Sequence, residues 1–278
     1  MGPAAETAGV TRRRVRAGRT ATLTPSHLRR CAWALVAALA IAIALAAPGA
    51  WSVGSHRAGA AGARTLSGRR ALTSLPVRAQ GPISSAIGAG ESRFYVRRLT
   101  GGWALAGGGV SASFGARVAT VTGSARGPRL ALSVAGIGRG SRLITPGAAA
   151  IAGHANRVSY GFAGLREWFA GGPLGIEQGF SVTRRPVGAR GQLTLSLTVG
   201  GGLRARLARS GTVNFYDGLR QQVLSYGGLS AVDAAGRRLP ATLALSRGRL
   251  LLRVADSGAR YPITIDPFIQ QGAKLVGD

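Results

Sequence analysis

Two glutamates are the best candidates for chemistry in this sequence. Glu167 and Glu177 lie in "GLREWFAGGPLGIEQGF", residues 164–180, one on either side of a turn rich in glycine and proline. Because they flank one turn, their side chains could lie near each other. A glycosidase needs such a pair, with the carboxyl groups about 5 to 9.5 Å apart. The alternation of residues 176–182 places Glu177 on the face opposite Phe180.

A structural role competes with catalysis for these two glutamates. Arg166, Arg184 and Arg185 offer counter-charge nearby in the sequence. An arginine neighbour lowers the pKa of a carboxyl group, which is the opposite of what a general acid needs. We therefore interpret the stretch as the corner of a sheet, where each glutamate pairs with an arginine or a backbone N–H. The sequence then predicts no catalytic residue and no enzyme activity. The alternative is a secreted carbohydrate-active hydrolase that uses Glu167 and Glu177.

Other motifs that carry chemistry are missing from the sequence or incomplete. There is no Gly-x-Ser-x-Gly nucleophile elbow, and His154 is expected in a loop without an acid close in sequence. The stretch "GIGRGS", residues 136–141, lacks the lysine and the helix of a phosphate-binding loop, so it predicts a turn between strands. Calcium needs clustered oxygens, whereas Asp217, Asp233 and Asp256 occur singly and are expected to stabilise turns. We predict no metal ion and no cofactor.

The aromatic residues are expected to pack in the core or along sheet edges rather than to form a sugar-stacking platform. These residues are Trp168, Phe169, Phe180, Tyr216 and Tyr226. Trp103, in "GGWALAGGG", is expected to be more exposed and is the best single candidate for an aromatic that contacts a ligand.

The net charge of +27 comes almost entirely from arginine, since Lys274 is the only lysine. A surface selected only for positive charge has little reason to exclude lysine. The bias, together with the abundant alanine and glycine, is typical of a GC-rich coding sequence. The arginines after residue 50 are scattered, without a basic helix or an aromatic-lined groove. We therefore do not expect nucleic-acid binding.

The N-terminus has the pattern of an export signal. Residues 11–30 are basic without an acid, and residues 31–47, "CAWALVAALAIAIALAA", carry no charge. Small residues around Ala46 and then Pro48 follow, as in a secretory signal peptide. The apolar run is also close to the length that spans a membrane. Residues 1–50 are thus predicted to be a signal peptide or an uncleaved signal-anchor helix, and the rest to be secreted or held at the cell surface. Any membrane contact is expected only through residues 31–47. Arg29-Arg30 weakly resembles a twin-arginine export signal. Cys31 is the single cysteine of the sequence, so a disulfide within the chain is excluded.

Period-two alternation predicts an all-β fold for the exported part. Residues 192–199, "QLTLSLTV", alternate apolar and polar without error. Similar strands are predicted at 130–134, 156–162, 241–246, 249–254 and 262–266, with glycine-containing turns between them and Asp266-Pro267 marking the exit from the last strand. The pattern predicts an antiparallel β-sandwich over residues 91–267, as one module or as two sub-sheets, 91–152 and 153–267. Residues 51–90, rich in alanine, glycine and arginine, are predicted to be a flexible linker.

Three stretches together resemble the N-terminal β-rich region of large exported bacterial proteins that carry FG-GAP repeats, the integrin-α-like blades of a β-propeller. They are "NRVSYGFAGLREWFAGGPLGIEQGF" (156–180), "GGLSAVDAAGRRLPATLAL" (227–245) and "LLLRVADSGARYPITIDPFIQQGAKLVG" (250–277). The resemblance covers roughly residues 92–278, and "YPITIDPFIQQ" marks the junction with the repeats. It implies that residues 268–278 are a linker to a repeat region that this sequence does not contain. Phe268, Ile269, Leu275 and Val276 would then be exposed.

These observations predict an exported, non-enzymatic β module of a cell-surface or secreted protein of the FG-GAP type, which acts in display, binding or adhesion. Its partners would be an extracellular protein or a glycan, and the downstream propeller repeats in a full-length form.

Overall fold

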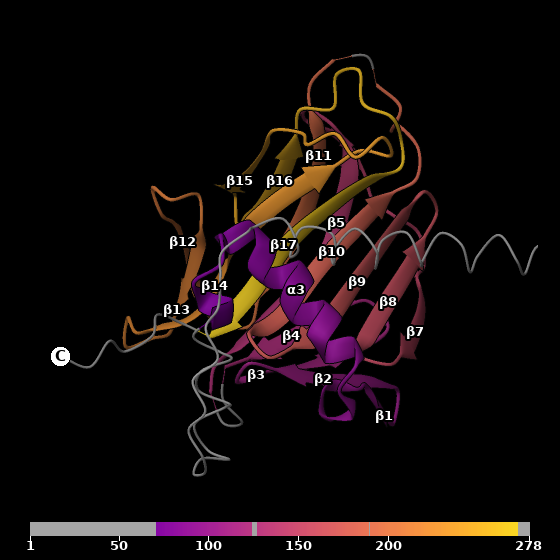
Figure 1. Cartoon of the computed structure of the whole chain (residues 1–278). Coiled ribbons are helices and arrows are strands. Elements are labelled where there is room, and N and C mark those ends of the chain that lie inside the picture. Colours follow the sequence, from indigo (N-terminus) through magenta and orange to yellow (C-terminus); the bar gives the residue numbers. More distant parts are fainter. Residues whose placement is uncertain (1–70, 124–126, 189, 272–278) are drawn as a thin grey trace, which may run out of the picture. The chain divides into compact units, whose positions relative to one another are not determined.

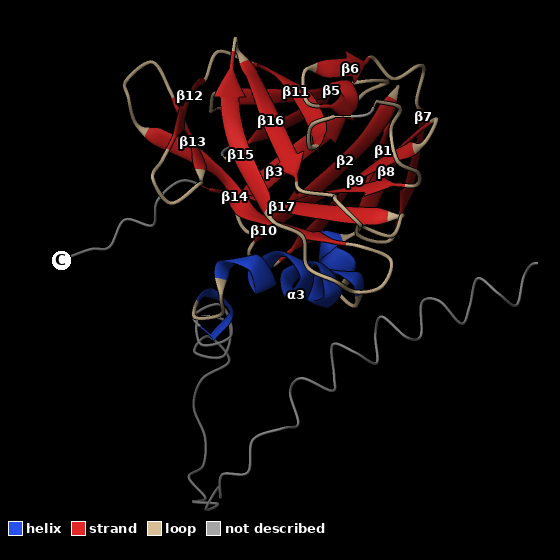
Figure 2. Ribbon diagram, turned by 90° about the horizontal axis from the view of Figure 1, so that it is seen from above, coloured by secondary structure: helices blue, strands red, loops and turns tan. Residues whose placement is uncertain are grey.

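The computed structural model describes residues 71–123, 127–188 and 190–271. These residues form two antiparallel β-sheets, the α-helix α3 (Val77–Ala89) and the short 3-10 helix η1 (Ser92–Phe94), and residues 71–73 are also helical. The sheets pack face to face, and α3 lies on the outer face of one of them (Figure 1). Figure 2, turned by 90°, shows the same layers with α3 outside the strands. The predicted antiparallel sandwich is thus confirmed for the described part of the chain.

Sheet A runs in the order β1 (Arg97–Leu99), β2 (Gly102–Gly107), β3 (Val110–Phe114), β4 (Ala119–Thr122), β5 (Arg129–Arg139), β11 (Leu193–Gly200), β16 (Arg249–Val254) and β15 (Ala241–Ser246), with β6 (Arg142–Ile144) also paired to β5. Sheet B runs in the order β12 (Arg204–Leu207), β13 (Val213–Tyr216), β14 (Gln222–Val232), β17 (Ile263–Gln271), β10 (Gly175–Val182), β9 (Leu165–Gly172), β8 (Arg157–Phe162) and β7 (Ala150–His154).

The core lies between the inner faces of the two sheets. Alternating residues point into it, as period two requires: Leu193, Leu195 and Leu197 of β11 are fully buried. Phe114 of sheet A packs on Phe169 of sheet B with ring centroids 5.0 Å apart, so aromatic contacts join the layers.

The division of the module into sub-sheets 91–152 and 153–267 is wrong. Strands β11, β15 and β16 come late in the sequence but belong to sheet A with β1–β6. Alternation tells which side chains face a core, and it does not tell which sheet a strand joins. The chain therefore crosses between the sheets repeatedly, and residues 91–271 form one core.

Two predicted boundaries also change. The stretch predicted as a linker, 51–90, contains α3, which packs on β9, β10, β14 and β17. At the other end, β17 continues to Gln271, and Phe268 and Ile269 are buried at 4% and 0% exposure. The expectation that these two side chains are exposed is therefore wrong.

Leu275 and Val276 lie outside the described residues, as do the predicted export signal, residues 31–47 and Cys31. Among residues 71–271, apart from the short gaps, no helix has the length and apolar character needed to cross a bilayer.

Candidate functional site

Glu167 points into the core of the sandwich. In the β9–β10 hairpin it lies directly opposite Phe180, and cross-strand partners share one face of a sheet. The Gln178 side chain donates a hydrogen bond from Nε2 to Glu167 Oε1 (2.6 Å), and the Tyr226 hydroxyl donates to Gln178 Oε1 (2.7 Å). Burial raises the pKa of Glu167 to about 8, while the hydrogen bond from Gln178 opposes this rise.

Glu177 lies on the opposite face of sheet B, beneath α3. It is opposite Phe268 of β17 and accepts a hydrogen bond from the Ser85 side chain of α3. Burial raises its pKa to about 8, and the negative charge of Asp266 adds to the rise. The Ser85 hydrogen bond and the Arg157 guanidinium oppose it.

Asp266 completes an acidic pair with Glu177 on this outer face. The register of β10 with β17 places it two residues from the partner of Glu177. Its Oδ1 is buried without a hydrogen-bond partner. Burial raises the pKa of Asp266 to about 7, against the effect of the Arg157 charge. Asp266 was predicted to mark the end of the last strand, but it lies inside β17.

Trp168 and Arg157 lie on the same outer face. The Arg157 guanidinium carbon is 3.9 Å from the centroid of the Trp168 ring, a cation–π contact. The indole covers Gly179, where a Cβ atom would overlap the ring. Burial lowers the pKa of Arg157, which the charges of Glu177 and Asp266 oppose.

The structure does not bring Glu167 and Glu177 together. One faces the core, and the other faces α3, with the sheet between them. The predicted arginine partners are absent as well: neither pKa is lowered by Arg166, Arg184 or Arg185, and Arg185 instead lies 3.9 Å from Asp256. The orientation of Glu177 away from Phe180 is confirmed.

The buried ion pair of the module joins Arg139 of β5 to Asp256. Asp256 also accepts hydrogen bonds from the Tyr261 hydroxyl (2.8 Å) and the Leu193 backbone N–H (3.2 Å), and Arg139 donates to the Gly191 carbonyl (2.7 Å). Burial alone would raise the pKa of Asp256, but the bonds from Arg139 and Tyr261 outweigh it, and the pKa lies below its usual value. These contacts hold strand ends together.

The prediction that Asp217 and Asp233 stabilise turns is confirmed. Asp217 accepts from the backbone N–H groups of Leu219 and Gln221, and Asp233 accepts from those of Ala235, Arg237 and Arg260. Among the described residues, no group of three or more His, Cys, Asp and Glu side chains is placed to hold a metal ion.

The packing role predicted for the aromatics is confirmed for Trp168, Phe169, Phe180 and Tyr226, which are all buried, and Tyr216 is half-buried under Arg206. Trp103 is half-buried rather than free for a ligand: its ring packs on Gly153 of the other sheet, with the Arg98 guanidinium carbon 4.8 Å from the ring centroid.

His154 ends strand β7 and does not lie in a loop. In "GIGRGS", Gly136–Arg139 belong to β5 and only Gly140-Ser141 form the turn.

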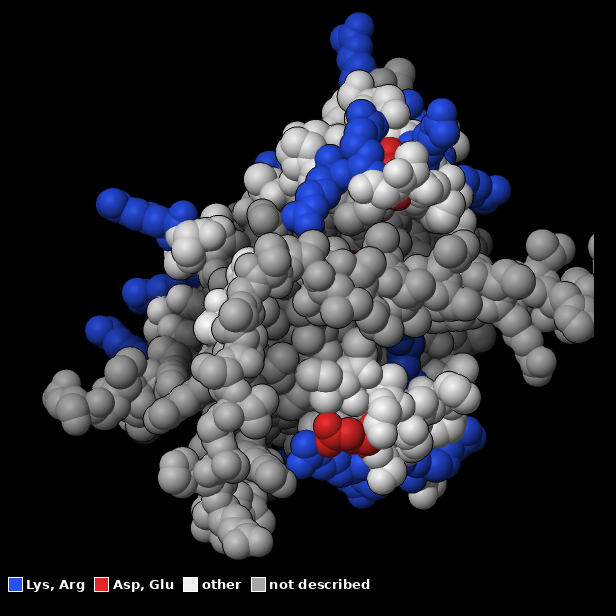
Figure 3. Space-filling view, viewed as in Figure 1, with Lys and Arg blue, Asp and Glu red and all other residues white. Residues whose placement is uncertain are grey.

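Charge is distributed very unevenly between the interior and the surface. Every described arginine side chain is exposed except those of Arg139 and Arg157, whereas all the described acidic residues are buried or half-buried. In Figure 3, basic side chains are seen at both ends of the described part and along its β12–β13 edge, and acidic atoms are seen in only a few places among the described residues. The exposed surface of the described part is therefore cationic.

A half-open hollow of about 290 Å³ lies at the edge where β12 and the β15–β16 hairpin meet. It is lined by Val199, Leu203, Ala205, Leu245, Ser246, Arg247 and Gly248. Arg247 is the only ionisable side chain in this lining, and neither glutamate contributes to it.

Comparisons with protein-family models, with curated proteins and with solved structures found no match to this chain. The likeness to the N-terminal region of FG-GAP repeat proteins therefore stays a prediction from the sequence.

Proposed function

We propose that this protein is an exported, non-enzymatic β module that binds an anionic extracellular glycan at the cell surface through its exposed arginines. The distribution of charge carries the proposal: the described acidic side chains are buried or half-buried, and the described arginines except Arg139 and Arg157 are exposed. Its place in a cell-surface or secreted protein of the FG-GAP type belongs to the same proposal.

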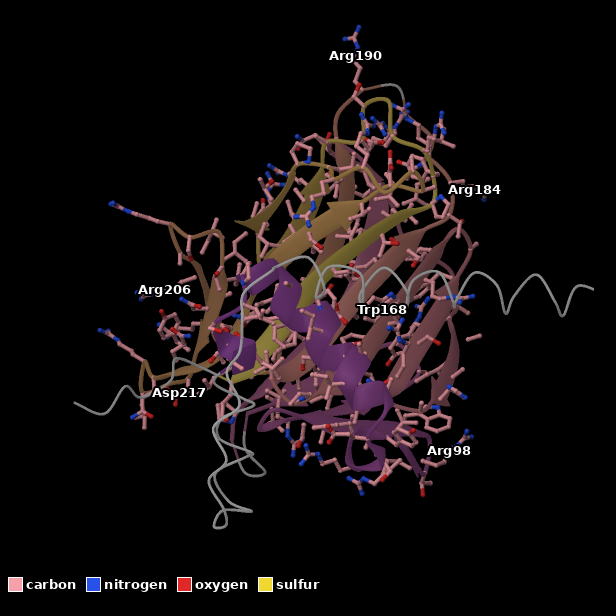
Figure 4. The ribbon with its side chains drawn as sticks, in the orientation of Figure 1. Arg98, Trp168, Arg184, Arg190, Arg206 and Asp217 are labelled. Atoms are coloured by element: carbon pink, nitrogen blue, oxygen red, sulfur yellow. The ribbon has the colours of Figure 1, made fainter. Side chains whose placement is uncertain are left out.

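The arginines would act together, because long-range attraction to a polyanion depends on the summed charge. In Figure 4, Arg184 and Arg190 lie at one end of the described part, Arg98 at the other and Arg206 at the β12–β13 edge. Loops and edges at these places are held by a rigid sandwich, which is the usual arrangement of a binding scaffold. A guanidinium group can bind a sugar carboxylate or sulfate through two parallel hydrogen bonds.

The hydrolase alternative has less support. Its two carboxyl groups must flank one glycosidic bond, but Glu167 and Glu177 lie on opposite faces of sheet B.

The test is a titration of the full chain with polygalacturonate, with uncharged dextran of similar length as the control. Affinity for polygalacturonate should fall steeply as the salt concentration rises, because each contact releases a bound counterion, and dextran should not bind. Replacing Arg204, Arg206 and Arg209 with glutamine should weaken binding and reduce the salt slope. The matched lysine triple variant keeps the charge, so it should keep the salt slope, but it should lose the part of the affinity that paired guanidinium hydrogen bonds supply.

Salt-independent binding, or equal binding of dextran, would refute the proposal. A parallel assay for new reducing ends detects the enzyme alternative, since cleavage that is lost in Glu177→Gln would support the hydrolase. Equally tight binding to duplex DNA would show that the module recognises polyanions in general rather than glycans.

A further inference from the structure

Helix α3 has the opposite polarity from an ordinary surface helix. Its inner face, against sheet B, consists of buried small or polar residues: Gln80, Gly81, Ser84, Ser85 and Gly88. Its outer face is apolar and consists of Pro82, Ile83, Ala86, Ile87 and Ala89, all exposed, which we call the α3 apolar face. A helix that covers a soluble domain normally buries its apolar stripe and exposes its polar one.

Polar contacts with the sheet fix this orientation. Ser84 Oγ accepts a hydrogen bond from the Leu174 backbone N–H (3.0 Å), and Asn156 donates to the Ser85 carbonyl (2.8 Å). At Gly88 a Cβ atom would overlap the carbonyl oxygen of Gly171. The helix therefore cannot rotate to hide its isoleucines without losing these contacts, and Ile83 and Ile87 remain 37% and 36% exposed.

The apolar character continues past the end of the helix and is bordered by arginines. Tyr95 is 42% exposed, and its hydroxyl donates to the Ala89 carbonyl (3.1 Å), which holds the ring against the last turn of α3. Arg97 and Arg98 are exposed two and three residues after Tyr95, whereas Arg93 pairs with Glu91 (2.6 Å). Figure 4 places Arg98 beyond the C-terminal end of α3.

We propose that the α3 apolar face lies in the interface of an anionic lipid bilayer, with Tyr95 at headgroup level and Arg97 and Arg98 on the lipid phosphates. Apolar side chains on one helix face beside basic residues and an aromatic are the features of interfacial helices. The upstream sequence supports a bilayer as the occupant: residues 31–47 are apolar and uncharged, and only residues 48–76 separate them from α3. The inference does not depend on the proposed glycan binding.

The experiment uses the full chain with Cys31→Ser and one new cysteine, Ile87→Cys, carrying an environment-sensitive fluorophore. A matched protein carries the label at Leu219→Cys, which is 81% exposed and lies in the β13–β14 turn. Both are reconstituted with vesicles of phosphatidylcholine and phosphatidylglycerol, or of phosphatidylcholine alone, that contain a nitroxide quencher in the acyl chains. Circular dichroism checks that each variant is folded.

The label at position 87 should shift to the blue and be quenched several-fold more than the label at 219 in the phosphatidylglycerol vesicles. Adding Ile83→Asn should reduce the quenching at 87. A blue shift without lipid quenching would mean that another part of the chain or a second copy covers α3, and would overturn the proposal. Emission typical of water would overturn it as well. Equal quenching in both kinds of vesicle would rule out an anionic surface as the occupant.

Discussion

Replacing Glu167 with glutamine should change how the stability of the protein depends on pH. The pKa of this buried carboxyl group is about 8 in the folded protein, against 4.5 for an ordinary glutamate. Between these values the native state holds a proton that the unfolded chain has released. The free energy of unfolding therefore falls as the pH rises from the unfolded value toward 8 and then levels off.

The magnitude follows from the same two values. Each pH unit in this window lowers the free energy of unfolding by about 1.4 kcal/mol per group. At neutral pH the protein is therefore less stable, through Glu167 alone, by roughly 3 kcal/mol than it is below the unfolded-state pKa. A glutamine does not ionise, and its carbonyl oxygen can still accept the hydrogen bond from Gln178. Glu177 and Asp266 are shifted in the same direction, so the variant should lose part of the pH slope and not all of it.

The assay is urea unfolding of the full chain, followed by tryptophan fluorescence at intervals between about pH 5 and about pH 8. The wild-type protein should lose stability over this range more steeply than Glu167→Gln, and the two curves should diverge as the pH rises. Glu91→Gln is the matched control, because Glu91 pairs with Arg93 at the surface and its side chain is 38% exposed. Parallel curves for the wild type and Glu167→Gln would refute the reasoning.

Two further substitutions test the internal contacts. Asp256→Asn leaves the buried Arg139 without its counter-charge, so urea unfolding should show a loss of about 3–5 kcal/mol, and no measurable loss would contradict the ion pair. Gly88→Ala pushes a methyl group against the carbonyl oxygen of Gly171 and should destabilise the docked helix by about 1–3 kcal/mol, seen as faster amide exchange in α3. At Gly90, at the end of the helix, there is room for a methyl group, so Gly90→Ala should leave amide exchange unchanged. Equal exchange in both variants would argue against the close approach of Gly88 to the Gly171 carbonyl.

The strands could be predicted from the sequence because their signal is local. Alternation identified the segments that became β8, β11, β15 and β16, and the turn glycines separated them. Helix α3 was missed because its buried face consists of glycine, serine and glutamine, so the usual apolar period does not face the core. The apolar residues at positions 83 and 87 have helical spacing, but the abundance of alanine, glycine and arginine in residues 51–90 indicated a linker.

The candidate site was only half predictable because it depends on register. Alternation within β10 correctly placed Glu177 away from Phe180, but the face of Glu167 depends on which residues form the turn between the strands. In the structure Gly172 pairs with Gly175, which puts Glu167 opposite Phe180 and in the core. A shift by one residue would have placed it on the other face. Asp266 was missed because Asp-Pro was taken as the end of a strand that in fact continues to Gln271.

The position of β17 has a consequence for how the chain is made. This strand, the most C-terminal among the described residues, lies between β10 and β14, so sheet B has no continuous ladder of hydrogen bonds until residues 263–271 are in place. Ile176 pairs with Ile269, which lies far along the chain, and such non-local pairings form slowly. Until β17 docks, β10 and β14 each present an unpaired edge. Such edges pair readily with other chains, so a chain whose β17 has not yet docked is open to aggregation.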